Sequence, residues 1–384
     1  MSPNCGSSID SIMKKILIFS LAYYPKVGGA EVAIKEITDR ITDVEFDMVT
    51  LRFGKEAKLE QVGKVLVHRV GFGGGYISKI LYLPLAAAEA FILNRQKKFD
   101  AAWAMMSYMT VPLMLLRMMG SSLPYVLTLQ EGDTESHTFG RLRVLPFLPF
   151  INAGFRSAIV VQAISTYLGA WARKRGFKGV LEVVPNGVDT RRFAIEHAAH
   201  EGVTLITSSR LVHKNGLDTV IRALPLLPVV RFVVCGAGPV ERTLKSLAQE
   251  LGVGGRVLFR GYIDHEELIQ ELRQADIFVR PSRSEGMGNS FIEAFAAGLP
   301  VIATQEGGIA DFLFDAKRNP GQPTTGWAVD KDSPEQVARA VEEILSNPER
   351  TRAVVKTAKE LAFEKYGWEL IAKNMREKVF AKVV

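Results

Sequence analysis

The sequence predicts an α/β protein made of two doubly wound domains in tandem. Short β-branched runs alternate with longer amphipathic stretches, a pattern typical of parallel sheets with helices on both faces. The alternation restarts near residue 203, after a polar stretch at 189–202. A length of 384 residues also favours two domains or more.

The expected strands are short apolar runs bounded by turn residues. In the first half they are 14–21, 45–51, 64–70, 101–106, 124–130, 157–164 and 181–187. In the second half they are 203–209, 229–236, 256–262, 276–282 and 300–304. Residues 1–13 are polar without an apolar signal core, so we expect a disordered leader there. The N-terminal domain then spans 14–193, a linker 194–202, and the second domain 203–365.

Composition favours a soluble protein in a reducing compartment. The sequence is 47% apolar and 23% charged, which are ordinary values for a globular chain. Its richest apolar segment, 81–93, contains Pro84 and Glu89 and is too short to predict a membrane span. Cys5 and Cys235 are the two cysteines, so a disulfide framework or cysteine metal site is not expected. We expect a cytoplasmic location.

Positive charge is concentrated in the first half. Through Phe193 there are 24 Lys and Arg against 16 Asp and Glu, whereas the remainder has 24 against 25. Such a surplus suggests an anionic partner such as membrane lipid, a phosphorylated substrate or nucleic acid. Solvated surface charge explains it equally well.

Ligands of such sheets bind outside the carboxyl ends of the strands, so the loops there are informative. Gly28 and Gly29 follow the first strand and open a helix, where free backbone N–H groups could hold an anion. Arg210 and Lys214 follow the strand at 203–209, and two cations there could neutralise a diphosphate. A tight turn and solvated surface charge are the structural alternatives.

The stretch "SEGMGNSFIEA" at 284–294 places two acids around two glycines at the start of a helix. Ser290 and Glu293 fit a capping box, and Gly298 is suited to end the helix. Glu285 has no such structural explanation. A carboxylate beside backbone amides could accept hydrogen bonds from sugar or ribose hydroxyls.

Two further glycine pairs follow strands in the second half. Gly236 and Gly238 form a G-x-G that lacks the third glycine of a dinucleotide fingerprint. Gly307 and Gly308 open another turn and could form a nest for phosphate or sugar oxygens. Four successive strand ends thus carry glycine-rich or charged loops, which favours a functional interpretation.

Taken together, these motifs resemble retaining glycosyltransferases of the GT-B fold, of the group 1 or family-four type. The resemblance covers about residues 14–384. It rests on "YYPKVGGAE", "VVPNGVDTRRF", "SSRLVHKNG", "GAGP" and "RPSRSEGMGNSFIEAFAAGLPVIAT" followed by "EGG". It implies two Rossmann-like domains that face each other across a cleft, with acceptors on the N-terminal side and the nucleotide sugar on the other.

The resemblance also implies a role for each matching residue. Arg210 and Lys214 would hold the donor diphosphate, Glu285 would bind hydroxyls of the transferred sugar, and Glu293 would bind the ribose. Gly29 would let the first loop approach the donor phosphates. The pocket would be lined by Gly286, Met287, Gly288 and Asn289. The implied reaction moves a sugar from a UDP- or GDP-sugar to a glycan, lipid-linked or small-molecule acceptor with retained configuration, without a metal or other cofactor, because the two cations neutralise the diphosphate.

One loop departs from the family pattern. The family often has a histidine where this chain has Gln130, and Glu131, Asp133 and His137 lie nearby. We expect Asp133 or Gln130 to orient the sugar or acceptor, and we expect His137 to be a surface residue.

Two segments and the C-terminus complete the expectations. Residues 77–98 and 141–156 mix apolar and aromatic side chains with Lys and Arg, which suits either core helices or peripheral attachment to the inner face of an anionic membrane. The resemblance implies that 366–384 forms a helix that crosses back to the first domain.

Three alternatives remain open at this point. An epimerase or phosphorylase of the same fold would also use this site. An NAD-dependent oxidoreductase is suggested only by "GAGP" and the two Rossmann-like halves. A basic nucleic-acid or lipid-binding module would leave Glu285 and the glycine loops unexplained, and we do not expect nucleic acid as a partner.

Overall fold

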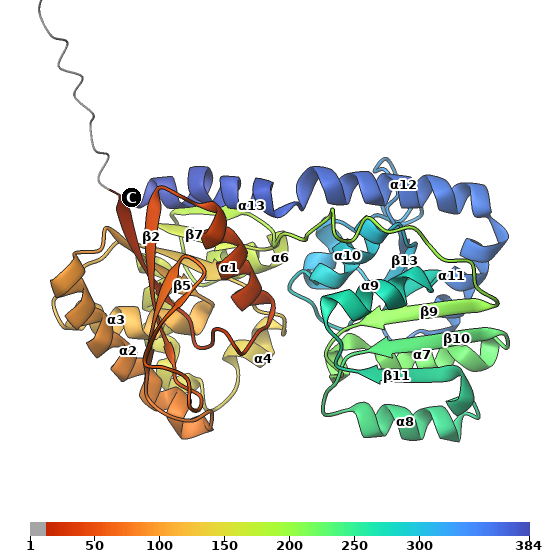
Figure 1. The fold of residues 1–384 in the computed structure, drawn as a ribbon, viewed down its shortest axis with the longest axis horizontal. Helices are drawn as coiled ribbons and strands as arrows, with labels where there is room; N and C mark the ends of the chain where they lie inside the picture. Colours follow the sequence, from red (N-terminus) through yellow and green to blue (C-terminus); the bar gives the residue numbers. More distant parts are fainter. Residues whose placement is uncertain (1–12) are drawn as a thin grey trace, which may run out of the picture.

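The computed structural model describes residues 13–384 and contains two α/β domains, each built on its own sheet (Figure 1). The expected leader and Cys5 lie outside the described residues, apart from Met13. The strands of both sheets are parallel except at one edge, which agrees with the β–α alternation of the sequence.

The first sheet has eight strands in the order β3-β4-β2-β1-β5-β6-β7-β8. They are β1 (Lys14–Phe19), β2 (Val44–Leu51), β3 (Leu59–Val62), β4 (Val65–Val70), β5 (Ala101–Met105), β6 (Tyr125–Leu129), β7 (Val160–Ala163) and β8 (Val180–Val183). The helices are α1 (Gly29–Arg40), α2 (Tyr76–Lys97), α3 (Thr110–Met118), α4 (Glu135–Phe139), α5 (Leu148–Ser157) and α6 (Thr166–Lys174). Strand β3 was not expected; it pairs antiparallel with β4 and forms the edge of the sheet.

The second sheet has six strands in the order β11-β10-β9-β12-β13-β14. They are β9 (Val203–Ser208), β10 (Val230–Cys235), β11 (Val257–Gly261), β12 (Ile277–Arg280), β13 (Val301–Ala303) and β14 (Trp327–Ala328). The helices are α7 (Leu217–Ala223), α8 (Glu241–Glu250), α9 (His265–Arg273), α10 (Asn289–Ala297), α11 (Pro334–Ser346) and α12 (Pro348–Lys365). The two-residue strand β14 is too short to leave a pattern in the sequence.

The end of the chain returns to the first domain. Helix α12 lies along the second domain, and α13 (Trp368–Asn374) continues along the first (Figure 1). Arg40 on α1 pairs with Glu369 at 2.9 Å. The buried Phe380 lies edge-on to Trp103 of β5, with ring centroids 5.0 Å apart. Apolar burial and ion pairs therefore hold the C-terminal segment on the first sheet.

Helix α2 coincides with the segment 77–98, for which the sequence predicts either a core helix or a membrane-binding helix. The apolar run 81–93 alone is too short to cross a membrane. The whole helix has 22 residues, with a mean hydropathy of 1.5 over an 18-residue stretch, and among the described residues it alone is long and apolar enough to do so. Pro84 lies inside it without ending it. Tyr82, Ala86 and Ala90 are buried against the first domain, so one face of α2 belongs to the core.

Candidate functional site

A cavity of about 950 Å³ lies between the two domains, where the carboxyl ends of both sheets meet. The first domain contributes the loop before α1, Gln130, Gly132 and Asn186. The second contributes Arg210 and the loop between β12 and α10. The cavity is therefore built from loops at the carboxyl ends of the strands, where ligands of such sheets are expected to bind.

The N-terminus of α1 points its amides toward this cavity. Gly28, Gly29 and Glu31 line it, and the Gly28 N–H donates to Glu31 Oε2 at 2.7 Å. A β-carbon on Gly29 would meet no other atom within 4 Å, so the space beside this residue is open to a ligand. The position suits an anion because helix N-termini carry free N–H groups and partial positive charge.

Glu285 is held by a buried arginine that the sequence analysis did not single out. Arg280, at the end of β12, donates from Nη2 to Glu285 Oε2 at 3.1 Å. Its Nη1 donates to the Ser208 carbonyl and to Ser290 Oγ, and its guanidinium lies 4.1 Å from the Phe291 ring centroid. Arg280 is 4% exposed, so this contact fixes the carboxylate at the wall of the cavity.

The predicted capping box at Ser290 and Glu293 is wrong. Helix α10 begins at Asn289 with Gly288 as its N-cap, and no side chain caps it. Ser290 lies inside the first turn, where its hydroxyl accepts a hydrogen bond from Arg280 instead. The predicted end at Gly298 is confirmed, with a left-handed φ of 79°.

Without the capping role, Glu293 is a carboxyl group facing the cavity. It lines the cavity from α10, and burial raises its pKa to about 7, although the Arg280 charge opposes the rise. Helix design therefore no longer explains this acid. A carboxyl near its pKa at neutral pH can accept or donate a hydrogen bond to a ligand hydroxyl.

The glycines of this loop are required by close contacts. A β-carbon on Gly286 would lie 2.3 Å from the Glu131 carbonyl oxygen of the first domain. Gly288 has a φ of 88°, and a β-carbon there would lie 2.6 Å from Arg280 Nη2. Met287 and Asn289 complete this wall of the cavity. Gly286 thus lets the two domains touch beside Glu285.

Of the two predicted cations, one faces the cavity and one bridges the domains. Arg210 follows β9, is exposed and lines the cavity. Lys214 does not line it; its Nζ donates to the Gly132 carbonyl at 2.6 Å and lies 3.7 Å from Asp133 Oδ1. Because Gly132 itself lines the cavity, the ammonium group lies just behind the wall.

The loop after β6 places Gln130 and Asp133 differently. Gln130 lines the main cavity and exchanges hydrogen bonds with Asn186, at 3.0 and 3.3 Å. Asp133 lines a neighbouring cavity, where it lies 3.7 Å from His137 Nε2. His137 is exposed, as expected. Asp133 is therefore not among the residues gathered around Glu285.

The other two glycine pairs are required by close backbone contacts, and Gly236 also lines the main cavity. A β-carbon on Gly236 would lie 1.9 Å from the Ser209 carbonyl oxygen, and one on Gly238 would lie 2.2 Å from that of Leu211. Gly308 donates its N–H to the Glu285 carbonyl at 3.1 Å, and a β-carbon on Gly307 would lie 2.0 Å from that oxygen. The expected oxygen nest at 307–308 is thus a support beneath the 285–286 backbone.

Arg280, Asn186 and Glu131 are the site residues that sequence reasoning missed or left without a role. An arginine inside the apolar run "DIFVRPS" was the available signal for Arg280, because a buried arginine requires a partner. Glu131 is buried, which raises its pKa, and its Oε1 accepts the Ser107 N–H at 2.7 Å. Asn186 lies in the motif "VVPNGVDTRRF", which supported the family resemblance without giving this residue a role.

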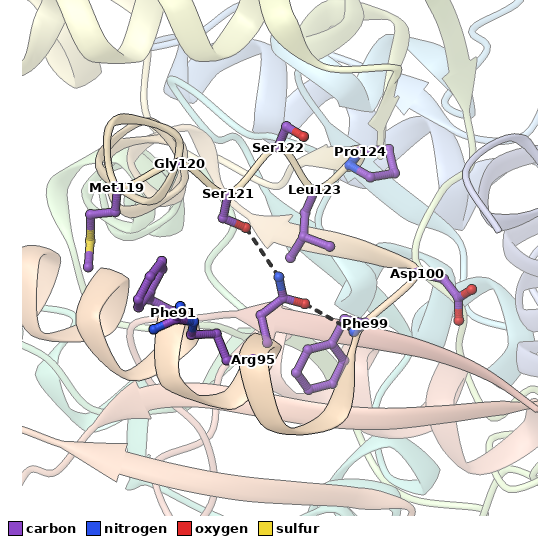
Figure 2. Close-up of a pocket in the computed structure, with 11 residues that line it drawn as sticks. Phe91, Arg95, Phe99, Asp100, Met119, Gly120, Ser121, Ser122, Leu123 and Pro124 are labelled. Carbon is purple, nitrogen blue, oxygen red and sulfur yellow. Dashed lines mark hydrogen bonds between the residues drawn. The ribbon is translucent and has the colours of Figure 1, made fainter.

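A separate cavity of about 510 Å³ lies at the amino ends of β5 and β6, away from this site (Figure 2). Asn94 lines it, accepts the Phe99 N–H at 3.0 Å and donates to Ser121 Oγ at 3.2 Å. No predicted site residue lies there. The site residues predicted from the sequence lie instead at the carboxyl ends of the strands.

Comparison with protein families agrees with this arrangement. The family described as Glycosyltransferase Family 4 matches residues 27–192, and the one described as Glycosyl transferases group 1 matches residues 188–361. The fold is similar to that of sucrose-phosphate synthase from Thermosynechococcus elongatus, with a TM-score of 0.81 and 20% identity over 96% of this chain and 99% of that one. The fold is therefore GT-B.

Two curated relatives are similar in sequence. The GDP-mannose-dependent alpha-(1-6)-phosphatidylinositol monomannoside mannosyltransferase of Mycobacterium tuberculosis (strain CDC 1551 / Oshkosh) is 33% identical over 64% of this chain and 68% of its own length. A GDP-mannose-dependent monoacylated alpha-(1-6)-phosphatidylinositol monomannoside mannosyltransferase of Corynebacterium glutamicum is 24% identical over 95% and 97%. The chain therefore belongs to the group 1, family-four glycosyltransferases.

Proposed function

We propose that this enzyme transfers mannose from GDP-mannose to a lipid-linked acceptor with a phosphoinositol headgroup, with retained configuration and without a metal ion. The Corynebacterium relative matches 97% of its own length, so the similarity extends over both domains. The single structural observation that carries the proposal is the Arg280–Glu285 pair at the contact between the domains.

In this proposal the donor occupies the main cavity, where its diphosphate meets cationic groups and its hydroxyls meet carboxylates. Its diphosphate lies between the N-terminus of α1 at Gly29 and the side chain of Arg210, both of which line the cavity. Lys214 reaches the diphosphate by releasing the Gly132 carbonyl. Glu285 accepts hydrogen bonds from hydroxyls of the sugar, and Glu293 binds the ribose.

The chemistry needs charge neutralisation at the leaving group. The bond from C1 of the sugar to the diphosphate oxygen breaks, and the acceptor oxygen bonds to C1 on the same face. The acceptor proton passes to the departing phosphate oxygen. Arg210 and Lys214 stabilise the negative charge that develops there, which is the role a metal ion has in other enzymes.

Helix α2 is proposed to attach the enzyme to the membrane. Ile77, Leu81 and Leu85 form an exposed apolar stripe at a spacing of four residues along it. Arg143 lies over the ring of Tyr76, the first residue of α2, at 5.7 Å from its centroid, and the preceding residue, Leu142, is 85% exposed. Apolar side chains flanked by arginines suit peripheral binding to an anionic surface.

Donor specificity is tested by thermal stabilisation with GDP-mannose, UDP-glucose, UDP-N-acetylglucosamine, ADP-glucose and NAD. A ligand at 100 times its dissociation constant adds about 2.7 kcal/mol, so binding is readily detected. We expect GDP-mannose to give the largest shift. Stabilisation by NAD alone contradicts the proposal.

Transfer is tested with radiolabelled GDP-mannose and phosphatidylinositol vesicles. We expect labelled lipid with an α-linkage, at an unchanged rate in EDTA. Conversion of GDP-mannose to another GDP-sugar without acceptor would indicate the epimerase alternative. Loss of activity in EDTA that added Mg²⁺ restores would contradict the metal-free mechanism.

Membrane attachment is tested by sedimentation with phosphatidylglycerol vesicles. Leu81→Glu should reduce the bound fraction several-fold, because it places a charge in the apolar stripe. The matched control is Leu258→Glu, an exposed leucine of the second domain. Equal binding of both variants would contradict attachment through α2.

A further inference from the structure

A third cavity, of about 280 Å³, adjoins the main one within the first domain. Met106 and Gly132 line both cavities, so the two cavities share part of their walls. Met106 has a φ of 74°, a strained conformation for a residue with a side chain. A ligand in this smaller cavity would lie directly beside a sugar held at Glu285.

The cavity contains a buried carboxylate with a free acceptor. Glu131 is 4% exposed, and its Oε2 has no hydrogen-bond partner among the described residues. Its other oxygen, Oε1, accepts the Ser107 N–H at 2.7 Å, which fixes the carboxyl orientation. A buried acceptor left unpaired is costly, so this oxygen is suited to a hydroxyl donor on a ligand.

Two arginines lie at the outer side of the same cavity. Arg141 lies 4.0 Å from Asp133, a weak and partly exposed contact. Arg143 lines the cavity, is exposed, and forms no ion pair within the described part of the chain. Together they could bind one anionic phosphate, since arginine is suited to hold phosphate oxygens in a fork.

The arginines also connect this cavity to the apolar face of α2. Arg143 lies over the ring of Tyr76, the first residue of α2, at 5.7 Å from the centroid. Ile77, which follows, is 72% exposed. Going outward from the main cavity, the chain therefore presents the Glu131 carboxylate first, then the two arginines, and then the apolar stripe of α2.

We infer that this cavity is the acceptor subsite and takes a polyol that carries a phosphodiester. Glu131 accepts a hydrogen bond from a polyol hydroxyl, Arg141 and Arg143 bind the phosphate, and the lipid chains extend along α2. The inference rests on the proposed function and specifies its acceptor site. Glu131 acts as a positioning residue that orients the acceptor.

The test measures binding of three soluble probes to the full chain by calorimetry: glycerophosphoinositol, myo-inositol and inorganic phosphate. The first carries both groups, and the others carry one each. We expect glycerophosphoinositol to bind at least 10-fold more tightly than either. Arg143→Ala should weaken the binding of glycerophosphoinositol about 10-fold and leave the binding of myo-inositol unchanged. Glu131→Gln should weaken the binding of both polyols.

Arg95→Ala is the matched control, because Arg95 is also an exposed arginine over a ring of α2, 5.2 Å from the Phe91 centroid, but lies outside this cavity. We expect it to bind like the wild type. Equal losses in Arg95→Ala and Arg143→Ala would overturn the subsite, and inorganic phosphate binding as tightly as glycerophosphoinositol would exclude the polyol. GDP-mannose binding and its slow hydrolysis should survive in Arg143→Ala; their absence in the wild type would instead contradict the proposed function.

Discussion

The loops that the two domains contribute to the main cavity differ in how tightly they are packed. In the second domain, the loop between β12 and α10 is packed on the side away from the cavity, with Arg280 beneath it and Gly308 hydrogen-bonded to its backbone. In the first domain, the loop after β6 is more open, and Asp133 has a 46% exposed side chain. Under the proposed function, the donor is bound by packed structure, whereas the acceptor is bound by a more exposed surface.

Glu285→Gln should have the largest effect on transfer. The substitution keeps the size of the side chain and one acceptor for Arg280 but removes the charge that binds sugar hydroxyls. We expect kcat/KM to fall by about 10² to 10³-fold. Steady-state rates with GDP-mannose measure this, and unchanged rates would remove Glu285 from the donor site.

Arg280→Met should have the largest effect on stability. It leaves the Glu285 carboxylate without its buried partner, which costs about 3–5 kcal/mol of unfolding free energy. Urea denaturation measures the loss. In the double variant with Glu285→Gln, the loss should be smaller than the sum of the single losses, because both act on one pair. Additive losses would contradict direct coupling.

Glu293→Gln should change the pH dependence of stability. The folded-state pKa of Glu293 is about 7, above the usual 4.5, so the folded protein binds more protons between these values. The resulting stability is present below pH 4.5 and is lost as pH rises through about 7. Between pH 5 and 8 the variant should therefore lose less unfolding free energy than the wild type, by about 2 kcal/mol.

Urea denaturation at both pH values measures this difference. Glu335→Gln, on the exposed side of α11, is the control and should keep the full decrease. If Glu293→Gln also keeps it, the carboxyl does not titrate with a raised pKa.

Sequence reasoning predicted the fold because β–α alternation is local and repeats along the chain. It singled out Glu285 as a candidate ligand-binding carboxylate because no rule of helix capping required an acid there. It misassigned Glu293 to a capping box because a matching S-x-x-E pattern does not fix where a helix starts. The observed N-cap is Gly288, two residues before the Ser290 that the pattern assumes. Arg280 was overlooked because its partners come from separate loops, and only the folded chain brings them together.

A pair of glycine substitutions tests the contact between the domains, with the smallest expected effect. At Gly286 an added β-carbon meets rigid backbone, the Glu131 carbonyl at 2.3 Å, so Gly286→Ala must push the domains apart. At Gly132 it meets the tip of a flexible side chain, Lys214 Nζ at 2.5 Å, which can move away. We expect the rate of transfer to fall about 10-fold in Gly286→Ala and less than 3-fold in Gly132→Ala. A 10-fold loss corresponds to about 1.4 kcal/mol of activation free energy. Equal losses would mean that the Lys214 bridge, and not the backbone contact, sets the distance between donor and acceptor.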